Sequence, residues 1–88
     1  MEQFSFFLEY DGRKTMTAAN HPPIDQITAL QIRQAVDKFC RKRGYKISNV
    51  ESLDEGDYRA FLYKKALFKK DKELIFYIRQ DSRQNTEV

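Results

Sequence analysis

The sequence has little of the side-chain chemistry that most active sites and metal centres use. It contains one cysteine, Cys40, and one histidine, His21. A single cysteine cannot form an intramolecular disulfide, which excludes a small secreted scaffold held by disulfides and favours a reducing, cytoplasmic location. One histidine and one cysteine also fall short of a structural zinc site, so we expect no metal and no cofactor.

Glycine and long apolar runs are scarce as well. The three glycines, Gly12, Gly44 and Gly56, each fall in a predicted turn or loop, which leaves none for a phosphate-binding loop. No segment approaches the roughly 18 consecutive apolar residues of a transmembrane helix. Residues 1–10 lack the basic start and the apolar run of a signal peptide. We therefore expect a soluble chain with no membrane partner.

What the chain does contain is enough apolar material for one folded core. Of its 88 residues, 41% are hydrophobic and 33% are charged, a balance that argues against a disordered chain. Seven phenylalanines and five tyrosines supply much of this core. A chain of this length builds one core only, so a single domain is predicted over residues 1–81. Residues 82–88 are predicted to be a polar, frayed tail.

The first segment reads as a strand that opens a hairpin. Residues 3–10 place Phe4, Phe6 and Leu8 on one face and alternate with the residues of the other. Asp11-Gly12 follows directly, and this dipeptide is typical of a two-residue type I′ turn, which pairs the strand with residues 13–17. The predicted cross-strand pairs include Glu9 with Lys14 and Phe7 with Met16.

A helix is predicted to begin at Asp25, or at Thr28 with a capping box, and to end before Gly44. The cations of the last turn suit the negative end of the helix dipole, and glycine suits the left-handed position that follows. At 100° per residue one face of this helix is apolar and packs on a sheet. That face consists of Ile24, Ile32, Ala35, Val36, Phe39 and Cys40.

The second half of the chain predicts three more strands. Residues 45–50 form a short strand, residues 52–57 an acidic loop, and residues 58–68 and 74–78 a second hairpin. The element order is therefore ββαβββ. The fold class is α+β, with an antiparallel sheet of about five strands and one helix packed across one face.

No catalytic set emerges from these residues. Cys40 lies on the apolar helix face, where a buried thiol is inert, and His21 falls in a loop. Asp54, Glu55 and Asp57 fit a solvated acidic loop better than a cation site or an acid/base pair. We therefore expect a protein that is not an enzyme.

The favoured interpretation is a small interaction or regulatory module that binds a protein partner, with a homodimer as a variant. One helix covers one face of a sheet, yet both faces of the predicted strands carry aromatic residues. Two apolar residues also fall on the polar side of the predicted helix, where they either pack under Pro22-Pro23 or form a small binding patch. The candidate contact residues are Phe7, Tyr10, Ile27, Leu30 and Tyr63.

The alternative is RNA or DNA binding. The net charge of +3 is uneven, because residues 58–88 carry eight Lys or Arg and four Asp or Glu. Basic residues at the helix end and in the second hairpin suit a phosphate backbone, and nearby tyrosines suit base stacking. The candidate residues are Lys38, Arg41, Lys42, Arg43, Tyr45, Lys46, Lys64, Lys65, Lys69, Lys70 and Lys72.

A second alternative is a compact ribonuclease-like hydrolase that uses arginine, lysine and tyrosine in place of histidine. Arg41, Arg43 and Tyr45 are the residues such an enzyme would use first. Salt separates the classes, because phosphate contacts weaken steeply as salt rises and apolar protein contacts do not.

Overall fold

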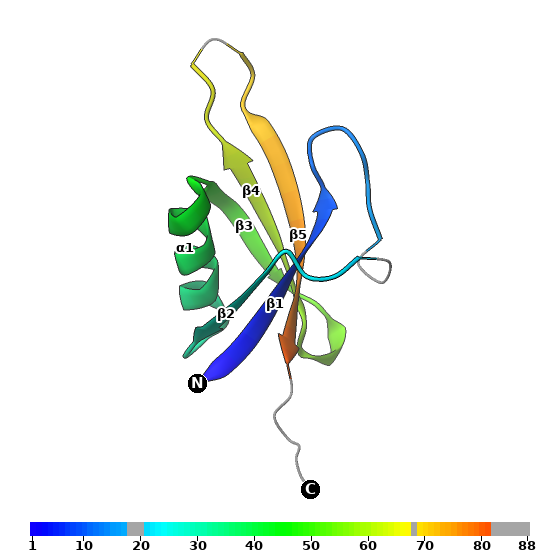
Figure 1. The fold of residues 1–88 in the computed structure, drawn as a ribbon, viewed down its shortest axis with the longest axis vertical. Helices are drawn as coiled ribbons and strands as arrows, with labels where there is room; N and C mark the ends of the chain where they lie inside the picture. The colour runs from blue at the N-terminus through cyan, green and yellow to red at the C-terminus, as the bar shows by residue number, and fades with distance from the viewer. Residues whose placement is uncertain (18–20, 68, 82–88) are drawn as a thin grey trace, which may run out of the picture.

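The computed structural model describes residues 1–17, 21–67 and 69–81. The predicted tail at residues 82–88 lies outside the described residues. A 3-10 turn, Asp54–Gly56, separates the third and fourth strands. The elements, shown in Figure 1, are β1 (Glu2–Tyr10), β2 (Asp25–Ala29), α1 (Ile32–Arg43), β3 (Lys46–Ser52), β4 (Tyr58–Lys64) and β5 (Lys72–Asp81).

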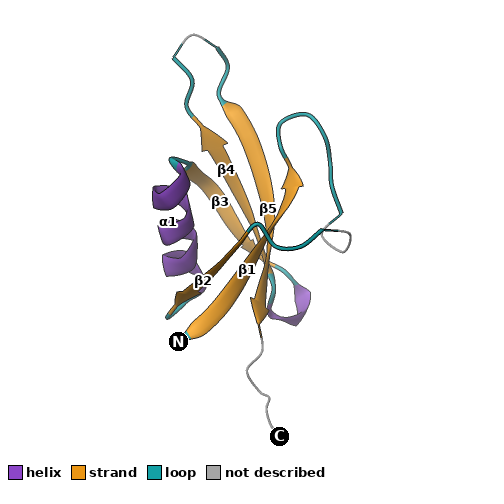
Figure 2. Cartoon of the chain, viewed as in Figure 1, coloured by secondary structure: helices purple, strands orange, loops and turns teal. Residues whose placement is uncertain are grey.

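The five strands form one sheet in the order β2-β1-β5-β4-β3, and every neighbouring pair is antiparallel. The two edge strands, β2 and β3, therefore run in the same direction. Strands that run in the same direction need a crossover connection, and α1 provides it by crossing one face of the sheet (Figure 2). The predicted α+β class, the element order and the single helix on one face are confirmed. No helix in the described part of the chain could span a membrane.

Aromatic side chains fill the space between α1 and the sheet. Phe39 of α1 stacks on Phe6 of β1, with ring centroids 4.2 Å apart, and meets the edge of Phe76 of β5 at 4.9 Å. All three rings are buried, together with Ala35 and Val36 of the same helix face. The predicted core face of the helix is confirmed from Ile32 onward.

The predicted start of the helix is wrong, because residues 25–29 form strand β2. Ile27 and Ala29 are buried while Gln26 and Thr28 are exposed, which is the two-residue period of a strand. Ile27 therefore lies in the core, and its place on the polar side of a predicted helix was a sign of the wrong period. The helix begins at Ile32, so neither Asp25 nor Thr28 caps its start.

The predicted end of the helix is confirmed. Gly44 has φ 74°, in the left-handed region, and its N–H donates to the carbonyl of Cys40. A β-carbon at this position would meet no atom within 4 Å, so backbone conformation alone favours glycine here.

The predicted two-residue hairpin is also wrong. The Asp11 carboxylate accepts hydrogen bonds from the N–H groups of Arg13 and Lys14, at 2.9 and 2.8 Å, and so widens the turn to four residues. A single bridge between Tyr10 and Thr15 follows, and β1 pairs instead with β2 and β5. The cross-strand pairs Glu9 with Lys14 and Phe7 with Met16 therefore do not form.

Truncation of the central helix ring tests this core. We expect Phe39→Ala to lower the free energy of unfolding by about 3 to 5 kcal/mol, because it empties the space between Phe6 and Phe76. Urea denaturation followed by circular dichroism measures the change. Leu30→Ala is the control, since Leu30 is 64% exposed and its loss should change stability by less than about 0.5 kcal/mol. Equal effects of the two substitutions would contradict this packing.

Candidate functional site

The sheet face opposite α1, here called the open face, carries a group of aromatic and charged side chains. The register places Phe7 beside Tyr77, Tyr77 beside Arg59, and Ile75 beside Phe61. Because side chains alternate along each strand, these residues point away from the helix. The open face includes Ser5, Phe7, Glu9, Arg59, Phe61, Tyr63, Ile75, Tyr77 and Arg79.

Most charged groups near the centre of the open face are paired with one another. The Arg59 guanidinium donates to the Glu9 carboxylate at 2.8 Å, and Arg79 donates to Asp81 at the same distance. Arg79 also lies over the Phe7 ring, 5.2 Å from its centroid. These pairs leave the centre of the face with little free charge.

The Tyr77 hydroxyl donates a hydrogen bond to the Asp57 carboxylate. Burial of the ring, with this hydrogen bond and the negative charge of Asp57, raises the pKa of Tyr77 to about 12. Tyr77 therefore holds its proton at neutral pH and is unsuited to act as a base.

A groove of about 860 Å³ runs along the open face beside β4, here called the β4 groove. Its apolar lining includes Phe61, Tyr63 and Ile75, which are half-buried and remain in contact with water. Lys65 and Lys70 lie on its rim, and polar residues of β3 form the opposite wall. Tyr63 was among the predicted contact residues, but Phe61 and Ile75 were not, although the two-residue spacing of Phe61 and Tyr63 is visible in the sequence.

A second groove, of about 700 Å³, lies between the open face and the β1–β2 loop. His21 lines it together with Arg59 and Tyr77, but His21 makes no hydrogen bond to any other described residue. Cys40 is buried in the core, as its place on the apolar helix face predicts, and burial raises the pKa of its thiol to about 11. Neither group has the activating partner that nucleophilic catalysis needs. Among the described residues, no cluster of three or more His, Cys, Asp or Glu could hold a metal ion.

The β4–β5 turn carries the second cluster of cations in the chain. Lys64 lies directly opposite Lys72 on the ladder, and like charges opposite each other repel. From residue 64 to residue 73 the sequence has five lysines and two acids, a net charge of +3. Lys65 pairs loosely with Asp71, at 3.7 Å. In Figure 1 this turn projects beyond the other strands. We call residues 64–73 the lysine arm.

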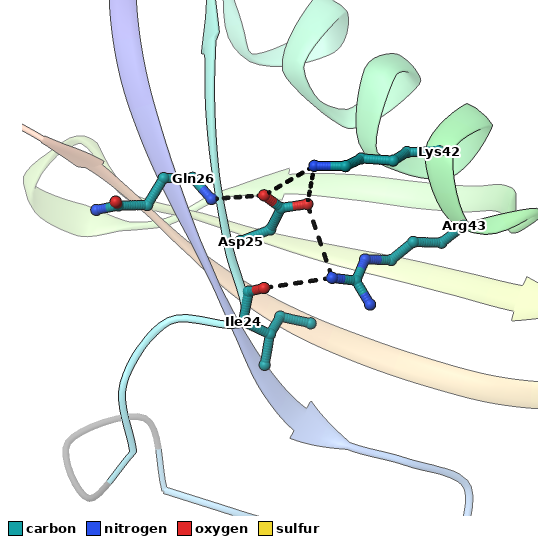
Figure 3. Close-up of polar contacts among 5 residues, drawn as sticks. All are labelled: Ile24, Asp25, Gln26, Lys42 and Arg43. Carbon is teal, nitrogen blue, oxygen red and sulfur yellow. Dashed lines mark hydrogen bonds and ion pairs between the residues drawn. The ribbon is translucent and has the colours of Figure 1, made fainter.

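The basic end of α1 has a different role, because its cations hold β2. Lys42 and Arg43 both pair with Asp25, with N–O distances of 2.9 and 3.7 Å, as Figure 3 shows. Arg43 also donates to the carbonyl of Ile24 at 3.2 Å. One turn earlier, Lys38 donates to the carbonyl of Thr28 at 2.8 Å. Three of the predicted nucleic-acid contacts are therefore bonded to the β2 strand.

The remaining predicted contacts at this end are dispersed. Tyr45 packs its ring against Phe39 and Phe76, with centroids about 6 Å apart, so it belongs partly to the core. Arg41 and Lys46 are exposed and form no ion pair with any described residue. Neither of the two grooves described above is lined by Arg41, Arg43 or Tyr45.

The predicted protein-contact residues also lie in different parts of the structure. Phe7 and Ile27 are buried, at 6% and 7% exposure, and so are not free surface residues. Tyr10 is half-buried, and Leu30 is exposed at the junction of β2 and α1. Only Tyr63 lies in the β4 groove.

The chain matches no protein-family model, no curated protein and no solved structure.

Acid should weaken the junction of α1 and β2. Burial alone would raise the pKa of Asp25, but hydrogen bonds from Lys42 and the Gln26 N–H, with the charges of Lys42 and Arg43, lower it overall. A lowered folded-state pKa contributes stability above the unfolded pKa, and this contribution is lost as pH falls through the folded value.

We expect Asp25→Asn to lower the free energy of unfolding by about 1 to 2 kcal/mol at pH 7 and to reduce the loss of stability below pH 4. Urea denaturation at a series of pH values measures both. Asp37→Asn is the matched control, because its 3.7 Å pair with Arg33 is solvent-exposed and worth little. An unchanged pH profile in Asp25→Asn would show that the junction does not depend on this carboxylate.

One tyrosine should titrate late. In an absorbance titration at 295 nm, we expect one of the five tyrosines to ionise near pH 12 and the step to disappear in Tyr77→Phe. Asp57→Asn should move it to lower pH, because the hydrogen-bonded negative charge is removed. A late step that persists in Tyr77→Phe would assign it to another residue.

Proposed function

We propose that this chain is a non-enzymatic interaction module that binds a protein partner in the β4 groove. The observation that carries the proposal is the presence of Phe61, Tyr63 and Ile75 in one groove on a sheet face that α1 does not cover. Apolar side chains gathered in a water-filled groove gain free energy when a partner covers them, at roughly 25 cal/mol per Å² of apolar surface.

The pairing of charges on the open face supports binding over catalysis. Arg59 and Arg79 are each bonded to a carboxylate, and Tyr77 is held in its neutral form by Asp57. A general base or a nucleophile needs a free or activated group next to the substrate. Arg59, Arg79 and Tyr77 are instead each bonded to a carboxylate, which suits a surface that stays unchanged while a partner binds.

The chemistry of the groove indicates the kind of segment it would take. Its apolar floor suits one or two large apolar side chains, and charges of both signs line it: Lys65, Lys69 and Lys70, and Glu51, Asp71 and Glu73. A segment that combines apolar residues with charges of both signs complements these features. The charges would then orient the partner in the groove, and the apolar contacts would hold it.

Nucleic-acid binding is a second candidate, favoured by the lysine arm. Lys64 and Lys72 face each other at direct cross-strand positions, an arrangement that a bound polyanion would relieve. Tyr63 at the base of the arm could stack on a base. The helix end contributes less to such a nucleic-acid surface, because Lys38, Lys42 and Arg43 are bonded to residues of β2.

Selection from a random peptide library displayed on phage tests the proposal directly. We expect wild-type protein to enrich peptides that contain large apolar residues together with charges of both signs. The double variant Phe61→Thr, Tyr63→Thr should bind them at least about tenfold more weakly, because groove contacts of about 1.4 kcal/mol or more are lost. Threonine keeps the strand propensity of both positions. Fluorescence anisotropy with a labelled peptide measures the affinity.

Leu30→Thr is the matched control, since it removes an exposed leucine outside the groove and should leave binding unchanged. Single-stranded RNA is titrated in parallel at about 50 and 200 mM salt. If no enriched peptide depends on Phe61 and Tyr63, the protein-binding proposal is wrong. RNA binding that falls with salt and is lost in Lys69→Glu, Lys70→Glu would support the second candidate instead.

A further inference from the structure

The two edges of the sheet are protected to different degrees. On β2, Lys38 donates to the carbonyl of Thr28, and the neighbouring Ile24 carbonyl accepts from Arg43. On β3, no side chain of the described residues hydrogen-bonds to the backbone of Lys46–Ser52, and β4 is its only strand neighbour. A strand with a free row of N–H and C=O groups is a template for another strand.

A bulge in β3 arranges its side chains symmetrically about Asn49. The register shifts between Ile47 and Asn49, so that Ser48 is an extra residue. Lys46 lies opposite Tyr63 and Glu51 lies opposite Arg59, which places both on the open face. Without the bulge, two residues five positions apart would lie on opposite faces.

The same shift places Ile47 and Val50 together on the helix-covered face, where they lie opposite Leu62 and Ala60. Both remain half-buried at the edge of the core. Counted without Ser48, the strand reads Lys46, Ile47, Asn49, Val50, Glu51. Its apolar residues are equidistant from Asn49, and so are its two opposite charges.

We infer that a second copy of this chain pairs with the β3 edge, antiparallel and about a two-fold axis at Asn49. In this register Lys46 of one copy faces Glu51 of the other, and Ile47 faces Val50, each pair occurring twice. Lys46 forms no salt bridge with any described residue of its own chain. Glu51 interacts with the charge of Arg59 opposite it but forms no salt bridge with a described residue. The product is one continuous sheet of ten strands, two copies of the five-stranded sheet.

This pairing goes beyond the proposed partner binding and does not depend on it. It does have a consequence for the β4 groove, because Asn49 and Glu51 line the groove and also border the two-fold axis. The two grooves of the pair therefore meet at the axis on one face of the sheet. Antiparallel symmetry places the two lysine arms at opposite ends of the joined sheet.

Sedimentation velocity of charge-reversal variants tests the register of this pairing. We expect wild-type protein to shift from monomer to dimer between about 5 and 500 µM. Lys46→Glu and Glu51→Lys should each weaken dimerisation at least about tenfold, because two attractive pairs become repulsive. An equimolar mixture of the two variants, or the double variant, should restore the dimer. Lys14→Glu is the matched control, since it makes the same charge change away from β3.

Disulfide trapping tests the position of the axis. In a Cys40→Ser background, Asn49→Cys should form a disulfide-linked dimer on mild oxidation, because the two residues face each other across the axis. Ser52→Cys should not, because regular strand geometry places its two copies about 20 Å apart.

A monomer at every concentration, a dimer unaffected by both single charge reversals, or equal trapping at positions 49 and 52 would each overturn the inference. None of these results would bear on peptide binding in the groove, so the two proposals fail separately.

Discussion

The pairing of β1 with β5 holds this fold together. The two strands are central in the sheet, yet they come from the two ends of the sequence, and Gln3 lies opposite Asp81. Ser5, which is fully buried, donates to the Asp81 carboxylate at 2.7 Å and accepts from Gln26 at 3.2 Å. The Asp81 carboxylate of β5 thus accepts a hydrogen bond from Ser5 of β1, and Ser5 in turn accepts one from Gln26 of β2. Among the described residues, this is the one strand pairing that joins β1 and β2 to β3, β4 and β5.

Sequence patterns predicted the elements that depend on local chemistry. The end of α1 at Gly44, its buried face and the second hairpin follow from glycine at a left-handed position, from helical periodicity and from alternation. Strand β2 was missed because its five residues were assigned to the first turns of a helix and not to a strand, although Ile27 and Ala29 have the two-residue spacing of a strand. What decides between them is the neighbour, since β1 presents an edge to Asp25–Ala29. The turn after Tyr10 was missed because the Asp11 side chain bonds to two backbone N–H groups that the type I′ turn does not use in this way.

The candidate site was predictable only in part, for a related reason. Tyr63 and the lysines of the arm were visible in the sequence, but their membership of one groove depends on the β4–β5 register, which could not be assigned from two half-apolar faces. The basic helix end illustrates the opposite case. Lys42 and Arg43 look like a phosphate-binding cluster in the sequence, yet Asp25 lies 17 positions away from Lys42 and meets it only in the folded chain.

The central place of β5 also has a consequence for biosynthesis. Translation adds about 5 to 20 residues per second, so several seconds pass between the synthesis of β1 and that of Lys72–Asp81. During that interval β1 lacks its main partner, and its four consecutive buried residues, Phe4 to Phe7, which face both sides of the sheet, are not yet covered. The sheet therefore closes only after its last strand has left the ribosome, and until then three phenylalanine side chains of β1 stay in contact with water.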